Sequence, residues 1–241
     1  MQELGQFLLL VTFFVTLSTA LLAIAAALTR QGAMMRASRY GLYASALLYV
    51  AMALILSHGF LTHDFSNKYI ATYSDRSMPT VYLMAAFWGG EKGALLLWTT
   101  ALSIFGSIAI HTRREREPVY LSWAIATLAL AIVFFDVLMV FESNPFETFV
   151  TSAGPMDGKG LNPLLQNPTM AFHPPTLLTG YIAFTIPFAF GVAALMTGKL
   201  DNQWITDSRT WTIISWCFLS IGLVLGALWA YEELGWGFYW M

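Results

Sequence analysis

The chain has 241 residues, of which 57% are hydrophobic and only 11% are charged, whereas ordinary globular domains carry about 25% charged residues. Its mean hydropathy of +0.62 is typical of a polytopic membrane protein and excludes a soluble enzyme with a water-facing surface. The net charge of −2 provides no basic field for nucleic acid, and the single cysteine, Cys217, excludes a CxxC pair or a CxxCH haem attachment site within this chain.

Six apolar runs are long enough to cross a bilayer, which takes about 20 residues in a helix. None of them alternates like a barrel strand, so we predict an all-α polytopic bundle of about six transmembrane helices in a single membrane domain, 1–241. The first run lacks a basic leader and a cleavage signal, which indicates a retained helix. In chain order the runs cover residues 4–29, 40–62, 93–110, 118–141, 176–198 and 210–231.

The basic residues predict the orientation of this bundle. Three short connections, 30–39, 111–117 and 199–209, carry eight of the 12 lysines and arginines. Cytoplasmic loops are enriched in these residues. We therefore expect both termini on the periplasmic side of a bacterial inner membrane, or of its organellar equivalent.

The longest connection, residues 142–175, falls on the same periplasmic side. It contains six of the nine prolines together with many apolar residues. Long connections of this kind are usually functional or disordered, and the apolar content argues against disorder. We expect an ordered external loop that lies on the helix ends.

Aromatic residues crowd residues 229–241, where two glycines, Gly235 and Gly237, interrupt the run. One interpretation is an aromatic belt at the membrane interface. The other is a platform for a large planar apolar ligand, because indole faces stack and bury area while glycines allow close approach.

His173 precedes two prolines, Pro174 and Pro175, just before the fifth run. It is either an ordinary loop histidine beside a helix-starting proline or an imidazole held on a stiff stub at the outer face. A neutral imidazole in that position is a good axial ligand for haem iron.

A third motif, Trp88-Gly89-Gly90-Glu91, lies at the outer end of the third run. An interface tryptophan and a helix start explain it in part, since a carboxylate is favoured near a helix N-terminus.

Elsewhere, we expect Asp136 to reach toward water from near its helix end, and Cys217 to be buried as a small hydrophobe.

Together these motifs resemble the CcmF-type cytochrome c haem lyases of the haem-handling WWD superfamily, of which the chain looks like an N-terminal part. The similar stretches are 88–97 (WGGEKGALLL), 158–175 (GKGLNPLLQNPTMAFHPP) and 229–240 (WAYEELGWGFYW), the last of which looks like the opening of the WWD motif. The motifs do not separate CcmF from its nitrite-reductase-dedicated paralogue.

The resemblance implies that b-type haem is a substrate, delivered by a haem chaperone of the cytochrome c maturation system. Apocytochrome c, with its thiol-handling partner, brings a CxxCH motif whose thiols add to the haem vinyl groups. Carried over to this sequence, His173 is the axial ligand candidate and Pro174, Pro175, Trp88, Gly89, Gly90 and Glu91 are supporting residues. The platform residues are Trp229, Gly235, Trp236, Gly237, Tyr239 and Trp240, with Phe238 in place of the usual glycine.

In the family, the rest of the WWD motif and the histidines that hold an internal haem lie beyond the position of Met241. The resemblance therefore implies either a subunit of a split lyase or an incomplete product, with a C-terminal lyase half or subunit as partner. Two other functions stay open: a membrane transporter or channel, and an assembly subunit that binds no haem.

Overall fold

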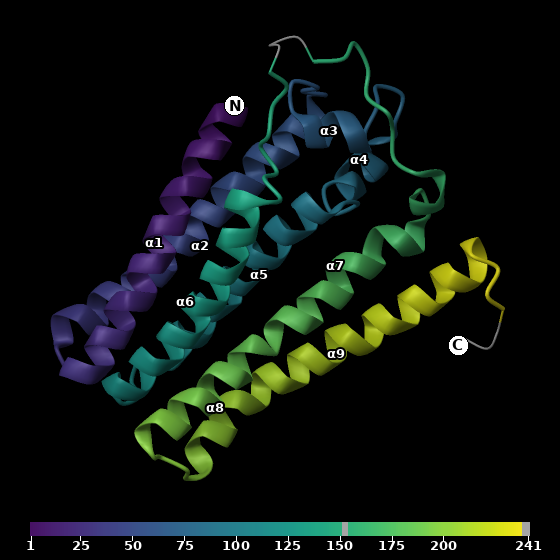
Figure 1. Cartoon of the computed structure of the whole chain (residues 1–241). Helices are drawn as coiled ribbons and strands as arrows, with labels where there is room; N and C mark the ends of the chain where they lie inside the picture. The colour runs from purple at the N-terminus through teal and green to yellow at the C-terminus, as the bar shows by residue number, and fades with distance from the viewer. Residues whose placement is uncertain (151–153, 238–241) are drawn as a thin grey trace.

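A computed structural model describes residues 1–150 and 154–237, which form helices joined by mostly short connections (Figure 1). The bounds are α1 Gln2–Thr29, α2 Gly32–Leu61, α3 Lys68–Tyr73, α4 Thr80–Ala86, α5 Glu91–Thr112, α6 Pro118–Phe141, the 3-10 turn η1 Pro163–Leu165, α7 Pro168–Ala183, α8 Thr185–Thr197 and α9 Asn202–Glu233.

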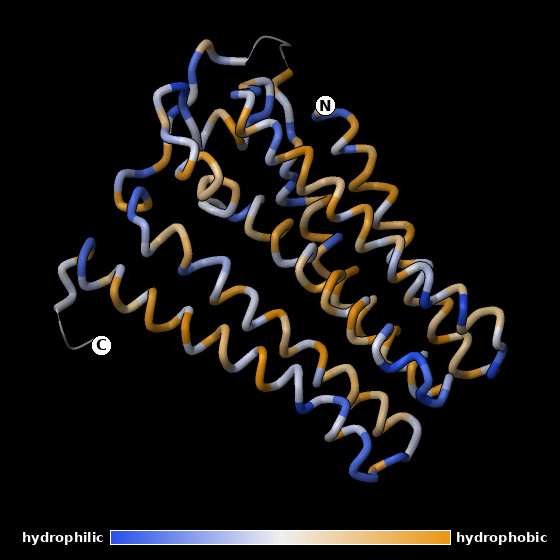
Figure 2. The backbone as a smooth tube through the Cα atoms, turned by 180° about the vertical axis from the view of Figure 1, so that it is seen from behind, coloured by the Kyte–Doolittle hydropathy of each residue, from blue (hydrophilic) through white to orange (hydrophobic). Residues whose placement is uncertain are grey.

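Within the described ranges, six helical stretches are long and apolar enough to cross a membrane, which confirms the predicted helical membrane bundle. Helices α7 and α8 together form one of these stretches, Pro168–Thr197. The stretch is interrupted at Phe184 because Pro187 has no N–H to donate to the carbonyl oxygen of Ala183. Figure 2 shows apolar residues along the helices and polar residues gathered at their ends.

The long helices form two groups (Figure 1). Helix α1 packs along α2 and α6, and α5 packs against α2 and α6. The second group is the antiparallel pair of α7 and α9, joined through α8, which contacts α6. The close approach of α7 and α9 depends on glycines: a Cβ at Gly180 would lie 2.5 Å from the Leu219 nitrogen, and one at Gly222 would lie 2.6 Å from the Leu177 Cα.

Two expectations about single residues are wrong. Asp136 does not reach water but is completely buried, because α1 and α2 supply hydroxyl donors at its depth: Thr16 and Tyr49 both donate to its carboxylate. Cys217 is exposed rather than buried. Helix α9 packs against α7 through its glycine-bearing face, which leaves Cys217 on the outer face beside Trp216.

The connection that follows α6 is ordered where it is described, as predicted. Phe146 is completely buried against Gly5, and its carbonyl oxygen accepts a 2.9 Å hydrogen bond from Gln6 Nε2. The backbone N–H of Lys68 donates to the backbone carbonyl oxygen of Glu147 at 2.8 Å, and the backbone N–H of Lys159 donates to the carbonyl oxygen of Ala71 at 2.8 Å. These bonds hold the segment on α1 and α3, at the end of the bundle opposite the basic connections (Figure 1).

Candidate functional site at the ends of α7 and α9

Helix α7 begins at Pro168, so the expected loop at 168–175 is helical and His173 lies in a helix rather than on a loop. Asn167 is the N-cap residue: its Oδ1 accepts a 2.7 Å hydrogen bond from the Thr169 nitrogen. Pro168 follows at the first helical position, where the missing N–H costs nothing. The Asn-Pro pair therefore starts the helix earlier than the apolar run alone predicts.

Trp88 explains how a proline fits inside this helix. Pro175 has no N–H to donate to the carbonyl oxygen of Ala171, four residues earlier. The Trp88 indole Nε1 donates to that oxygen instead, at 3.2 Å. Trp88 thus holds α7 at the point where the His-Pro-Pro sequence weakens it, a role beyond that of an interface tryptophan.

His173 faces α9. Its Nδ1 lies 2.7 Å from the carbonyl oxygen of Gly222, and because a carbonyl only accepts, Nδ1 carries the proton and donates. In the neutral ring, Nε2 then keeps its lone pair. The imidazole is half-buried, and a Cβ at Gly226 would lie 2.5 Å from its Cε1 atom. Gly226 therefore provides the space that the ring occupies.

Trp229 lies about one turn beyond Gly226 on α9. It is half-buried, and its Nε1 donates to the Leu164 carbonyl oxygen of η1 at 2.9 Å. Trp236 follows the helix end and is 50% exposed, between Gly235 and Gly237 with φ of +64° and +67°. These left-handed values favour glycine. The predicted platform residues Tyr239 and Trp240, like Phe238, lie outside the described residues.

Sequence reasoning missed a polar contact that joins the two helix ends. Asn167 Nδ2 donates to Glu233 Oε1 at 2.8 Å and to Glu232 Oε2 at 3.2 Å. Two carboxylates in the last turn of a helix oppose its dipole. Adjacent acids at a helix C-terminus therefore signal that a partner is needed, and here the partner is the cap of α7.

The glycines of the Trp88-Gly89-Gly90-Glu91 motif allow close packing. A Cβ at Gly89 would lie 3.0 Å from Leu161 Cδ1, and one at Gly90 would overlap the Tyr73 ring. The neighbouring Tyr69 hydroxyl donates to the Phe87 oxygen at 2.9 Å. Burial raises the pKa of Tyr69, so this hydroxyl keeps its proton and its role as a donor.

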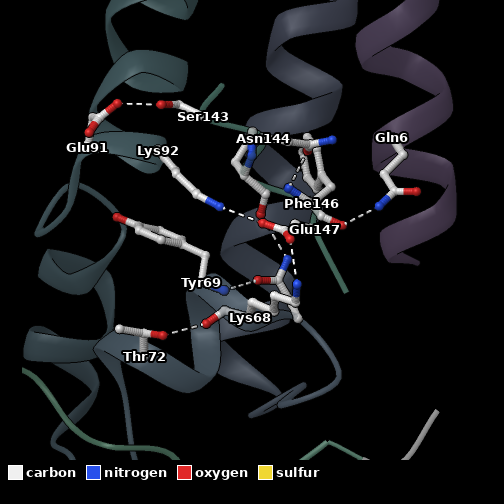
Figure 3. Close-up of polar contacts among 12 residues, drawn as sticks. Gln6, Lys68, Tyr69, Thr72, Glu91, Lys92, Ser143, Asn144, Phe146 and Glu147 are labelled. Carbon is white, nitrogen blue, oxygen red and sulfur yellow. Dashed lines mark hydrogen bonds and ion pairs between the residues drawn. The ribbon is translucent and has the colours of Figure 1, made fainter. Parts of the chain in front are cut away.

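Charged residues beside this motif bind the segment that follows α6 (Figure 3). Glu91 accepts a hydrogen bond from the Ser143 hydroxyl. Glu147 accepts from Lys68 at 2.5 Å and from Lys92 at 2.8 Å. These two lysines, Lys68 first, lower the pKa of Glu147 to about 2. Glu91 and its neighbours thus position the outer segment, and His173 and Trp229 lie on the helix pair beside it.

The chain is similar to known proteins in sequence and in structure. Residues 88–241 match the family model described as cytochrome C assembly protein. The chain is 39% identical to the cytochrome c-type biogenesis protein CcmF of Haemophilus influenzae over 241 residues, which cover 99% of this chain and 37% of that protein. It is 36% identical to CcmF of Escherichia coli over 244 residues, or 100% of this chain and 37% of that protein.

The cytochrome c-type biogenesis protein NrfE of H. influenzae is 38% identical over 186 residues, covering 77% of this chain and 29% of that protein. A solved structure of the cytochrome c haem lyase CcmF superposes with a TM-score of 0.84 at 30% identity, covering 98% of this chain and 37% of that chain. The chain thus spans 37% of the length of the two CcmF relatives. The resemblance to CcmF-type proteins is confirmed, and the chain belongs to the cytochrome c assembly protein family.

Proposed function

We propose that this chain provides a haem-holding surface of a cytochrome c haem lyase, with His173 as an axial ligand of the haem iron. The observation that carries the proposal is the 2.7 Å hydrogen bond from His173 Nδ1 to the Gly222 oxygen. Histidines that bind metals usually donate their other ring N–H to a carbonyl or carboxylate, which fixes the tautomer and orients the ring. His173 already has this arrangement, with the Nε2 lone pair left for iron.

The aromatic residues after Gly226 supply the second part of the surface. Trp229 is anchored by its bond to Leu164, and Trp236 is half exposed. We propose that these indoles, with Gly235, Gly237, Tyr239 and Trp240, form the platform on which the macrocycle rests, since ring faces stack and bury area. The latch between Asn167 and the Glu232–Glu233 pair would keep the platform at a fixed distance from His173.

In this proposal b-type haem is the substrate, which a haem chaperone delivers. Each thiol of an apocytochrome c CxxCH motif adds across one haem vinyl group, so that the sulfur bonds to one carbon and a proton adds to the other. The chain's own residues hold the iron and orient the ring for that addition. The proposal also includes a C-terminal lyase half or subunit as partner, because the chain spans 37% of the relatives' length.

We place this surface on the periplasmic side. The argument is the enrichment of lysine and arginine in the three short connections at the other end of the bundle. The start of α7, which carries His173, and the end of α9, which carries Trp229, then face the compartment in which apocytochrome c would meet haem.

Haem titration of the purified 241-residue chain in detergent tests the proposal. We expect the wild type to bind haemin with the absorption spectrum of a histidine-ligated iron, and His173→Ala to lose that spectrum. His58→Ala is the matched control, because His58 is an exposed histidine near the same end of the bundle. Unchanged spectra in His173→Ala, or equal losses in both variants, would contradict the ligand role. A wild type that binds no haemin would favour the assembly-subunit alternative.

A further inference from the structure

A groove between α2 and α5 is lined by none of the residues of the proposed haem surface. Its volume is about 420 Å³, and its walls are apolar: Ala46, Leu47, Val50, Ile104 and Ile108. From Ile104 to Thr112 it runs for about 12 Å along α5, at 1.5 Å per residue. Leu47 and Ile108 are exposed to the surroundings of the bundle, so the groove opens toward the lipid.

The groove ends in a polar cluster at the basic end of the bundle. Arg114 Nη1 lies 3.2 Å from His111 Nε2, and the Tyr43 hydroxyl lies 3.5 Å from His111 Nδ1. A guanidinium only donates, so Nε2 accepts, the imidazole is neutral and its proton is on Nδ1, facing Tyr43. The Tyr43 hydroxyl oxygen therefore accepts a hydrogen bond from His111 Nδ1, and its own O–H is left to donate to another acceptor.

The charges around this mouth are mainly positive. Arg39 lies one turn before Tyr43 on α2. Arg114 is exposed, and Glu115, at 3.4 Å from its Nε, is a largely exposed acid with a 90% exposed side chain. An ion pair that exposed contributes little. The mouth thus combines two guanidinium groups and a phenolic donor, all of which suit a phosphate.

We propose that this groove binds one anionic phospholipid, with an acyl chain between α2 and α5 and the phosphate at Arg39, Tyr43 and Arg114. Basic pockets between transmembrane helices on the cytoplasmic side are suited to anionic headgroups, and the apolar walls match an acyl chain. Charge complementarity favours an anionic lipid over a zwitterionic one. Both would fill the apolar groove equally well, but the anionic headgroup would gain more binding free energy from the arginines at the mouth.

Lipid retention measures this preference. The full chain is reconstituted in nanodiscs of phosphatidylglycerol and phosphatidylcholine with identical acyl chains, at equal amounts, and the lipid kept after detergent extraction is quantified by mass spectrometry. We expect the wild type to retain phosphatidylglycerol over phosphatidylcholine by about tenfold or more, from two basic contacts. The double variant Arg39→Gln/Arg114→Gln should bring the ratio close to one.

Two further variants separate a built site from general surface charge. Arg30→Gln/Arg209→Gln removes the same charge from two exposed positions, one just after α1 and one on α9, that do not line the groove, and should keep the preference. Val50→Phe fills the groove beyond the mouth and should lower the retention of both lipids. The proposal is overturned if the wild type retains the two lipids equally, if the control double variant loses the preference as fully as the groove variant, or if Val50→Phe leaves retention unchanged.

Discussion

Replacing Gly226 by alanine tests whether α9 sets the position of the His173 ring. The new Cβ would lie 2.5 Å from His173 Cε1 and 2.8 Å from Nδ1, whereas carbon atoms in contact sit about 3.5–4 Å apart. The ring must therefore move by about 1 Å, which lengthens the Nδ1–Gly222 hydrogen bond from 2.7 Å to beyond the usual limit of about 3.2 Å. We expect the free energy of unfolding to fall by about 1–3 kcal/mol from overpacking, and by about 1 kcal/mol more from the weakened hydrogen bond.

Thermal unfolding of the purified chain, followed by haemin titration, measures both effects. Gly226→Ala should lower the melting temperature and weaken the histidine-ligated spectrum. Gly191→Ala is the control, because among the described residues its Cβ would meet only Trp204, at 3.9 Å, in ordinary van der Waals contact. If both variants melt at the wild-type temperature and bind haemin alike, α9 does not position His173 and the reasoning fails.

Three other perturbations probe the outer segment, the helix latch and the bundle core. The pKa of Glu147 in the folded chain is lowered from 4.5 to about 2, so the stability that its ion pairs provide is complete above pH 4.5 and is lost as the pH falls toward 2. This stabilisation is under about 1 kcal/mol, because the pair with Lys68 is partly exposed. Glu147→Gln should flatten this part of a profile of stability against pH. Asn167→Ala should cost about 1–2 kcal/mol in thermal unfolding, from the lost cap, and Asn167→Asp should not restore it fully, since a carboxylate would repel the glutamates at the end of α9. Asp136→Ala should cost about 1–3 kcal/mol, more than Asp136→Asn, because the asparagine oxygen still accepts from Tyr49; equal melting temperatures would contradict the buried contact.

Hydropathy predicted the six spans because transfer into lipid depends mainly on composition over about 20 residues. It placed the starts of α7 and α9 too late, at 176 and 210 instead of Pro168 and Asn202. Helix α9 begins with polar turns after its cap Asp201, and such turns carry no apolar signal. Helix α7 begins at the pair Asn167-Pro168, but His173 and two prolines interrupt its apolar residues before the long run starts. Capping residues mark these starts better than hydropathy does.

The site could be predicted only as a set of residue types. Motif reasoning singled out His173 and Trp88 but could not show that Trp88 replaces the hydrogen bond missing at Pro175, because that contact joins residues 83 positions apart. Asp136 was misjudged for the same reason: its partners, Thr16 and Tyr49, are on other helices. The sequence did contain one signal for the packing of α9 against His173. Gly222 and Gly226 are four residues apart, a spacing that is typical of closely packed membrane helices.

Chemical rescue is the decisive test of whether the His173 imidazole ligates haem iron. His173→Gly removes the side chain, and free imidazole is then added to the haemin-loaded chain. We predict that the variant loses the histidine-ligated spectrum and that imidazole restores it, while the wild-type spectrum stays unchanged. A His173→Gly spectrum identical to that of the wild type before imidazole is added would show that His173 is not the iron ligand.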